Sequence, residues 1–270
     1  MKDSLVLIKY IDGVYNTLED NSLKVSTPNS INDPFELMIQ EPEIYSRDQV
    51  KEYLSNLKKE GYNLIDMDLE LIVDKFITNA HKESLFKKMT MNMKNAVDFN
   101  FISFSSKRAN PTQDYFMWSL YGSKPGNPHC GVRLHFDSES LIKNKKNFKL
   151  ERIIYSKERL KLNNPFQAQS PESLEMFRQL LLTKSDIWSH ECEYRLIIKP
   201  RLNDVWERDG KEFLHFPTRS LKKIIFGFNF EDAKIEDVII SLSSDKRYGH
   251  VKLFKTELHP RKFELKYIRV

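Results

Sequence analysis

The chain has 270 residues, of which 40% are hydrophobic and 12% aromatic, enough for a sizeable core in one large or two ordinary domains. Its two cysteines, Cys130 and Cys192, are far apart in the sequence, which excludes a disulfide framework or zinc knuckle and favours a reducing cytoplasm. The net charge of +5 comes from 43 basic and 38 acidic residues, so it permits contact with nucleic acid without arguing for it.

The first third of the chain predicts short strands followed by a helical segment. Apolar residues alternate over 5–10 and 22–27, and a helical turn through Val14 and Leu18 separates these strands. The apolar run over 5–8 is too short for a signal peptide or a membrane span, so we expect no membrane anchoring. A polar loop over 28–34 precedes a charged stretch in which Leu69, Ile72 and Phe76 recur at helical spacing. This stretch predicts a helical insertion at about 41–98.

The remaining segments mix strands and helices without regular alternation. Strands are expected over 101–105, 130–136, 148–155, 193–199, 213–216, 222–228 and 263–270, and helices over 114–120, 171–182 and 231–241. There is neither a glycine-rich phosphate loop nor a dinucleotide fingerprint. We therefore predict one α+β domain over residues 1–270, with a mixed, mainly antiparallel sheet and the helical insertion.

The motif Asn32-Asp33-Pro34-Phe35-Glu36 combines a turn-forming pair with a proline that keeps Asp33 out of helical geometry. One interpretation is a structural turn. The other is a ligand loop, because it carries one amide and two carboxylates.

Large side chains recur at helical spacing in Met117-Trp118-Ser119-Leu120-Tyr121, just before Gly122. Aromatic residues of this kind mostly pack in a core. Alternatively, Trp118 or Tyr121 forms a pocket wall on which a base or a nicotinamide stacks.

Two carboxylates, Glu191 and Glu193, stand two residues apart at the entry to an apolar strand and are expected to share one face. Close carboxylates suit acid-base catalysis, a divalent metal or stabilisation of a sugar cation. The alternative is a surface ion pair with Arg195 at a strand edge. The histidines, among them His129 and His135, lack metal-ligand spacing, so no metal site is expected.

A series of short blocks recurs in one order along the chain: Lys9-Tyr10, Ser26-x-Pro28, Asn32-Asp33-Pro34-Phe35, Phe101-x-Ser103-Phe104-Ser105, Met117-Trp118-x-x-Tyr121, Gly131 with Phe136, Tyr155, and the segment from Lys184 to Arg195. In this order the blocks resemble the bacterial family catalogued as domain of unknown function 2971. The resemblance spans nearly the whole chain, and it implies no established reaction.

A second resemblance concerns mechanism. A basic or aromatic strand residue, then a Ser-x-Ser strand, then Glu-x-Glu leading a strand is similar to the ADP-ribosyltransferase plan, in which the three blocks line an NAD cleft. The resemblance implies Glu193 as the catalytic glutamate, assisted by Glu191. It implies NAD binding, without a metal, by a wider set of residues: Lys9, Tyr10, Asn32, Asp33, Ser103, Ser105, Trp118, Tyr121 and Arg195. The sequence departs from the plan at Lys9, where arginine or histidine is usual, and at Phe104 between the serines.

The first functional hypothesis is thus an NAD-using ADP-ribosyltransferase or NAD glycohydrolase, acting as a toxin or phage-defence effector on water or on a nucleic-acid or protein acceptor. The rival is a non-catalytic sensor domain that binds a nucleotide or a partner protein. A third hypothesis, a metal-dependent nuclease, requires Asp33 and Glu36 to lie beside Glu191 and Glu193.

Overall fold

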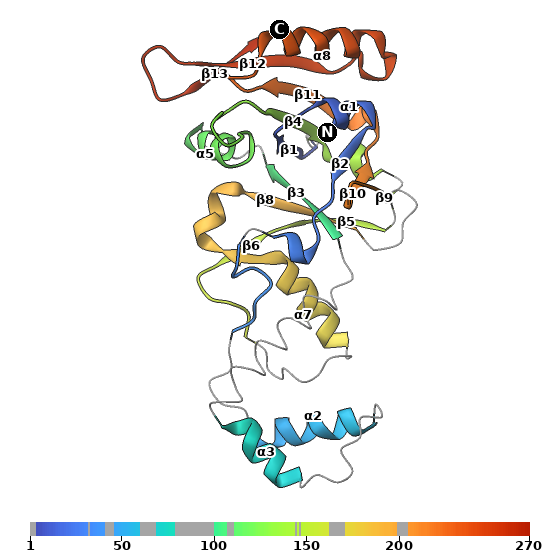
Figure 1. Cartoon of the computed structure of the whole chain (residues 1–270), viewed down its shortest axis with the longest axis vertical. Helices are drawn as coiled ribbons and strands as arrows, with labels where there is room; N and C mark the ends of the chain where they lie inside the picture. Colours follow the sequence, from blue (N-terminus) through green and yellow to red (C-terminus); the bar gives the residue numbers. More distant parts are fainter. Residues whose placement is uncertain are drawn as a thin grey trace. The chain divides into compact units, whose positions relative to one another are not determined.

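The computed structural model describes residues 4–31, 33–40, 46–59, 69–78, 100–106, 111–143, 145, 147–161, 171–198 and 205–270. The chain divides into two compact units (Figure 1). The first, here called the core unit, comprises residues 1–27, 99–153 and 187–270, and the second unit comprises residues 28–98 and 154–186. The single domain expected over residues 1–270 stays a prediction.

Among the described residues of the core unit, eight strands form one sheet in the order β13-β12-β11-β4-β1-β3-β8-β5. Their bounds are β1 Val6–Ile11, β3 Asn100–Ser106, β4 Val132–Asp137, β5 Phe148–Arg152, β8 Glu193–Ile198, β11 Leu221–Phe226, β12 Lys252–Leu258 and β13 Leu265–Arg269. The pair β11–β12 is parallel and the other neighbours are antiparallel. Helix α8 (Asp232–Ser244) connects the parallel pair, because parallel strands need a crossover. The predicted α+β fold with a mainly antiparallel sheet is confirmed.

Strand alternation gives this sheet two different faces. Leu7, Leu134 and Ile224 point to a hydrophobic core that includes the apolar side of α8. Ile8 and Tyr10, which alternate with Leu7, instead pack with Met117 and Trp118 of α5 (Pro111–Tyr121). The large sheet is therefore covered by α8 on one face and by α5 on the other, and the second face is called the α5 face below.

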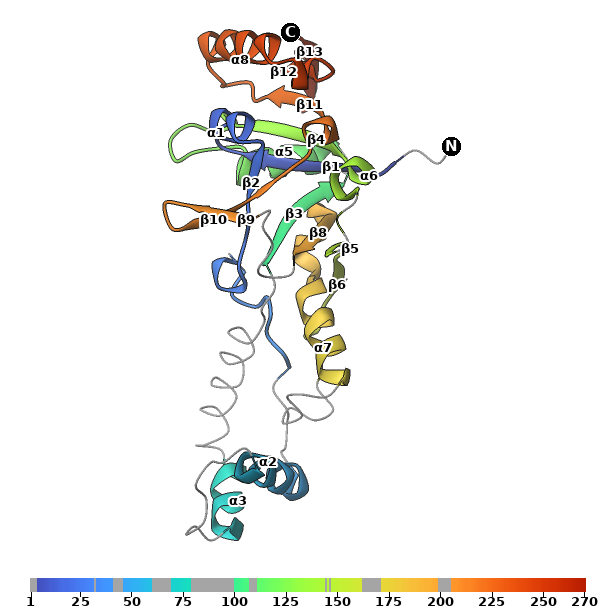
Figure 2. The same ribbon diagram turned by 90° about the vertical axis from the view of Figure 1, so that its right-hand side faces the viewer.

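A smaller sheet in the core unit has the order β2-β10-β9, with β2 Ser22–Lys24, β9 Val205–Arg208 and β10 Lys211–His215 (Figure 2). Asp209 and Gly210 join β9 to β10 with φ angles of 52° and 67°. Two successive left-handed residues make the tight turn that suits a two-residue hairpin. Leu23 and Leu214 bury one face of this sheet in the main core.

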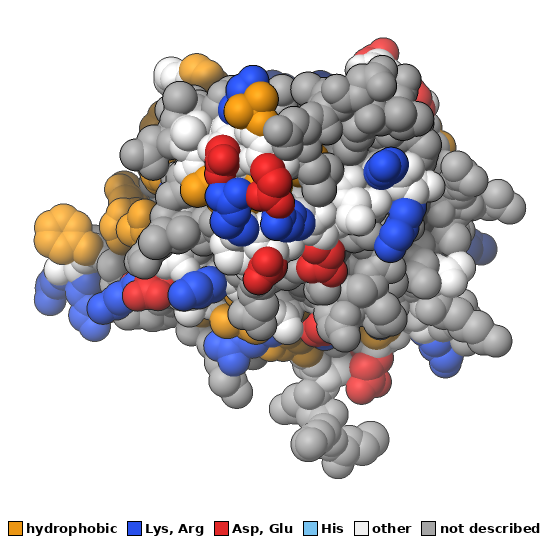
Figure 3. Space-filling model, turned by 90° about the horizontal axis from the view of Figure 1, so that it is seen from below, with side chains coloured by type: hydrophobic (Ala, Val, Ile, Leu, Met, Phe, Trp, Pro, Cys, Tyr) orange, Lys and Arg blue, Asp and Glu red, His pale blue; other side chains and the backbone are white. Residues whose placement is uncertain are grey.

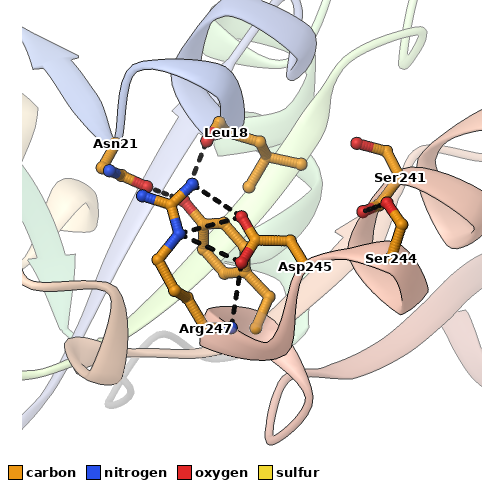
Figure 4. Close-up of polar contacts among 7 residues, drawn as sticks. Leu18, Asn21, Ser241, Ser244, Asp245 and Arg247 are labelled. Carbon is orange, nitrogen blue, oxygen red and sulfur yellow. Dashed lines mark hydrogen bonds and ion pairs between the residues drawn. The ribbon is translucent and has the colours of Figure 1, made fainter.

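The remaining short elements of the core unit are α1 (Tyr15–Glu19), α6 (Ser138–Ile142), η3 (Thr218–Ser220) and η4 (Lys246–Tyr248). Figure 4 shows the polar contacts around η4, which follows α8, including those to Leu18 of α1 and to Asn21. The Tyr248 hydroxyl contacts the carbonyl of Leu18 at 2.9 Å and the side-chain oxygen of Asn21. Asp245 caps η4 by accepting from the main-chain nitrogen of Arg247 at 2.9 Å. Burial raises the pKa of Tyr248 to about 12, so its hydroxyl stays protonated.

The second unit contains η1 (Pro28–Ser30), α2 (Arg47–Lys59), α3 (Leu69–Ile77), β6 (Ile154–Ser156), α7 (Pro171–Leu182), β7 (Thr183–Ser185) and the start of η2 (Asp186–Glu191), and β6 and β7 pair in parallel. Helices α2 and α3 are the described part of the predicted insertion. Arg47 and Lys51 of α2 form ion pairs with Glu70 of α3, at 2.5 and 2.6 Å. Figure 3 shows basic and acidic side chains lying side by side on the face seen from below. Exposed pairs of this kind contribute little to stability.

Candidate functional site

The predicted first block, serine block and glutamate block lie on three adjacent strands, β1, β3 and β8. Ser105 of β3 stands opposite Glu193 of β8 and opposite Ile8 of β1. Ser103 stands opposite Arg195. Residues directly opposite each other in antiparallel strands share a face, so these side chains lie on the α5 face.

Lys9 joins the first two blocks through its ammonium group. Strands β1 and β3 are in register at only two pairs, Leu7 with Ser106 and Ile8 with Ser105. Beyond these two pairs, Nζ of Lys9 donates to the carbonyl of Ser103 at 2.9 Å. A side chain of β1 thus supplies the donor to β3 at this point, in place of a main-chain N–H.

Burial lowers the pKa of Lys9 to about 8, while Glu193 and, more weakly, Glu191 raise it. Lys24 of β2 lowers this pKa further, by repulsion between two positive charges. Lys9 therefore lies within electrostatic reach of both candidate carboxylates, and it loses its proton at a much lower pH than an ordinary lysine.

Glu193 forms an ion pair with Arg195 in the interior of the core unit. Nε of Arg195 donates to Oε1 of Glu193 at 2.8 Å, and the two residues are only 1% and 3% exposed. The guanidinium also lies over the ring of Phe101, 4.4 Å from its centroid. The pair considered from the sequence is thus present, but on an interior strand instead of an exposed strand edge. Because both charges are buried, each depends on the other.

Glu191 reaches the site by a different route from the one expected. It ends η2, one residue before Cys192, whose φ of 46° is left-handed. The strand begins only at Glu193, so the two carboxylates are related by a turn and not by strand alternation. Glu191 is 4% exposed and its Oε1 accepts from the Tyr121 hydroxyl at 2.6 Å. A residue of α5 therefore fixes the second carboxylate.

A polar network that the sequence did not predict lies on the same face. The Tyr10 hydroxyl donates to Oδ1 of Asp114 at 2.6 Å, and Asp114 also forms an ion pair with Arg133. Arg133 donates from Nε to His135 at 2.8 Å and from Nη1 to the Tyr267 hydroxyl at 3.0 Å. Burial is the main cause that raises the pKa of Tyr10 well above its usual value and that of Tyr267 to about 12. The alternation of Val132, Leu134 and Phe136 was the available signal, since it places the intervening Arg133 and His135 on the opposite face.

Trp118 lies beneath this network and has no exposed surface. Its ring meets Tyr10 edge-on, with centroids 5.3 Å apart, and stacks on His129 with centroids 6.1 Å apart. A side chain on Gly122 would approach the Trp118 ring to 2.5 Å, which explains the glycine there. These contacts are those of a core residue, whereas Tyr121 is half-buried and contacts Glu191.

The loop motif belongs to the second unit, and Asn32 lies outside the described residues. Asp33 is 6% exposed and its Oδ1 accepts from the main-chain nitrogen of Phe35 at 2.9 Å, as in an Asx turn. Glu36 is also buried, with Nζ of Lys184 3.8 Å from its Oε2. Its convergence with the core-unit residues, on which the nuclease hypothesis depends, stays a prediction. Within the described segments, no group of three or more His, Cys, Asp or Glu side chains could hold a metal ion.

In the described part of the chain, no helix is long and apolar enough to span a membrane. Comparison with curated proteins and with solved structures gave no significant match. A family model does match residues 117–196, which run from α5 to β8 and include Tyr121, Glu191 and Glu193. Over these residues the chain carries the pattern of the family described as Protein of unknown function (DUF2971), which confirms the predicted family resemblance for this segment. The resemblance of the blocks before residue 117 stays a prediction.

Proposed function

We propose that the protein is an NAD-using ADP-ribosyltransferase or NAD glycohydrolase in which Glu193 is the catalytic carboxylate. The observation that supports this most is the placement of Glu193 of β8 directly opposite Ser105 of β3. Lys9 of β1, beyond β3, alternates off the α5 face, yet its ammonium is close enough to interact with the charge of Glu193. Three sequence blocks that are far apart in the chain thus lie on the successive strands β1, β3 and β8, which supports the proposal.

In this reaction, the bond between C1′ of the ribose and the nicotinamide nitrogen breaks, and its electron pair leaves with nicotinamide. Positive charge then develops on the ribose. The carboxylate of Glu193 stabilises that charge and accepts a hydrogen bond from a ribose hydroxyl. The nucleophile, either water or an acceptor group, forms the new bond to C1′ and gives up one proton, which Glu191 receives. No metal enters this scheme.

The neighbours of Glu193 have positioning roles. Arg195 holds Oε1 at 2.8 Å and is itself held over Phe101, so the carboxylate has a fixed direction. Tyr121 holds Glu191 in the same way, at 2.6 Å. Preorganised groups of this kind need no rearrangement when charge develops, which is the main source of electrostatic catalysis.

A second candidate function, a ligand-binding sensor without catalysis, is favoured by the same ion pair. Glu193 and Glu191 both have partners within the protein, Arg195 and Tyr121, as expected of a structural network. A sensor would bind a nucleotide and leave it unchanged, so only the fate of the nucleotide separates the two functions.

The test follows nicotinamide release from NAD by chromatography, with and without nucleic acid or cell lysate as acceptor. Glu193→Gln removes the charge and retains the shape, and Glu257→Gln, at an exposed position of β12, is the control. Because loss of one member of a buried pair costs about 3–5 kcal/mol, melting curves must show that the variant is folded at the assay temperature. Release by the wild type and by Glu257→Gln, but not by Glu193→Gln, supports the enzyme. NAD binding without release under any condition supports the sensor.

A further inference from the structure

We propose that the outer face of the β2-β10-β9 sheet binds single-stranded nucleic acid. Leu23 and Leu214 turn inward to the core, so the residues that alternate with them point outward. The registers place Trp206 opposite Phe213 and Lys211 opposite Arg208, all on this outer face. Lys24 of β2 stands opposite Phe213 and shares this face, whereas Ser22, opposite His215, is buried.

Aromatic rings on this face lie in nearly parallel planes. Trp206 stacks on Phe213 with centroids 5.2 Å apart and planes at 30°, and on His215 with centroids 5.6 Å apart and planes at 15°. Trp206 and Phe213 are half-buried and His215 is exposed. Nucleobases stack on such rings whatever their sequence, because every base has a flat face.

The charges on this face are complementary to a phosphate backbone. Lys24 and Lys211 are exposed, and the guanidinium of Arg208 lies over the Trp206 and Phe213 rings, 5.2 and 4.8 Å from their centroids. The two carboxylates of these strands, Glu207 and Glu212, alternate onto the opposite face.

One carboxylate does reach the basic side chains, because Asp20 pairs with Arg208 at 2.7 Å. Among the described residues, neither Lys24 nor Lys211 forms an ion pair, so two positive charges remain beside the stacked rings.

The combination of parallel rings with flanking cations selects a single strand over a duplex. In a duplex the base faces are covered by neighbouring bases, and only the phosphates remain available. This inference goes beyond the proposed function and does not depend on it, because nucleic-acid binding is measured without NAD and nicotinamide release is also measured in the absence of nucleic acid.

The test is fluorescence anisotropy of the full chain with a labelled mixed-sequence DNA oligonucleotide of about 12 nucleotides, its RNA equivalent, and the DNA duplex, over a range of salt. The variant Lys24→Glu/Lys211→Glu is compared with Lys149→Glu/Lys252→Glu, which changes two exposed lysines of β5 and β12 and alters the net charge equally. Trp206→Leu and Trp206→Phe then separate the loss of the ring from its conservative replacement.

Single strands should bind more tightly than the duplex. Lys24→Glu/Lys211→Glu should weaken binding and reduce the slope of log K against log salt by about 1.4, at about 0.7 per lost phosphate contact, whereas the control pair retains both values. Trp206→Leu should weaken binding about tenfold, and Trp206→Phe should restore most of it. No binding at about 100 μM protein and low salt, equal loss in both lysine pairs, or equal affinity for duplex and single strand would each overturn the proposal.

Discussion

The lowered pKa of Lys9 makes a quantitative prediction about stability. The pKa is about 8 in the folded protein, against 10.5 for an ordinary lysine, chiefly because the ammonium is buried. Between these two values the unfolded chain binds more protons than the folded protein, so the free energy of unfolding must rise with pH. Below the folded-state pKa, the whole cost of burying the charged ammonium is present, and it is relieved as pH increases.

The magnitude follows from proton linkage at the two pKa values. From about pH 7 to about pH 9.5, Lys9 should add about 2 kcal/mol to the free energy of unfolding. Measurements should stop at that pH, because Tyr267 and Tyr248 have pKa values of about 12 in the folded protein. Above the ordinary tyrosine pKa of 10.0, these two residues lower the free energy of unfolding as pH rises.

The perturbation is Lys9→Met, which keeps the length of the side chain and removes the titrating group. Urea unfolding of both proteins at several pH values gives the difference in unfolding free energy, and changes from groups common to both cancel. Loss of the hydrogen bond from Lys9 to Ser103 changes the free energy of unfolding of Lys9→Met by the same amount at every pH. A difference that stays constant across the range would show that Lys9 has an ordinary pKa in the folded protein.

Three further predictions concern the frame around the site. Gly227→Ala should destabilise the protein by about 3 kcal/mol, because the new Cβ would lie 2.0 Å from the His129 carbonyl, whereas Gly13→Ala, with nothing within 4 Å, should leave the melting temperature unchanged. Asp114→Asn should lower the free energy of unfolding by about 3–5 kcal/mol, because Arg133 would be buried without its counter-ion. Ultraviolet titration of this variant should show lower pKa values for Tyr10 and Tyr267, and unaltered titration would show that Asp114 does not act on them. Tyr248→Phe should cost about 1 kcal/mol through the lost bond to Leu18, and an unchanged urea midpoint would contradict that role.

The elements with a strong local signal were predicted with accurate bounds. The predicted helix over 171–182 has the same limits in the structure, as α7. Proline suits its first position because the φ of proline is already helical, and because the N–H that proline lacks would have no partner there. By contrast, the predicted strand over 148–155 is two strands interrupted at Ile153. The alternation set by Phe148 and Leu150 ends at Arg152, and two apolar residues follow in succession, so the sequence did carry a sign of the break.

Other elements were missed because their residues mix polar and apolar types. Strand β12 (Lys252–Leu258) lies near one end of the sheet, where half-exposed positions tolerate polar residues, and it was not predicted. The left-handed conformation of Cys192 was also unpredictable, because non-glycine residues seldom adopt it. That residue decides how Glu191 is placed relative to Glu193.

The sequence predicted strands that carry the candidate residues, but not the contacts around these residues. Three strand blocks were expected to meet, and Lys9, Ser105 and Glu193 do lie on adjacent strands. The network of Asp114, Arg133 and Tyr267 was missed, since alternation tells which residues share a face but not which distant residues cover it.

The catalytic role of Glu193 is measured by the rate of nicotinamide release by wild-type protein and by Glu193→Gln at equal concentrations of folded protein. If the carboxylate stabilises the developing ribose cation, the rate should fall at least about 100-fold in the variant, as for other removed electrostatic contacts in active sites. A folded Glu193→Gln protein that releases nicotinamide at the wild-type rate would contradict the assignment of Glu193 as the catalytic residue.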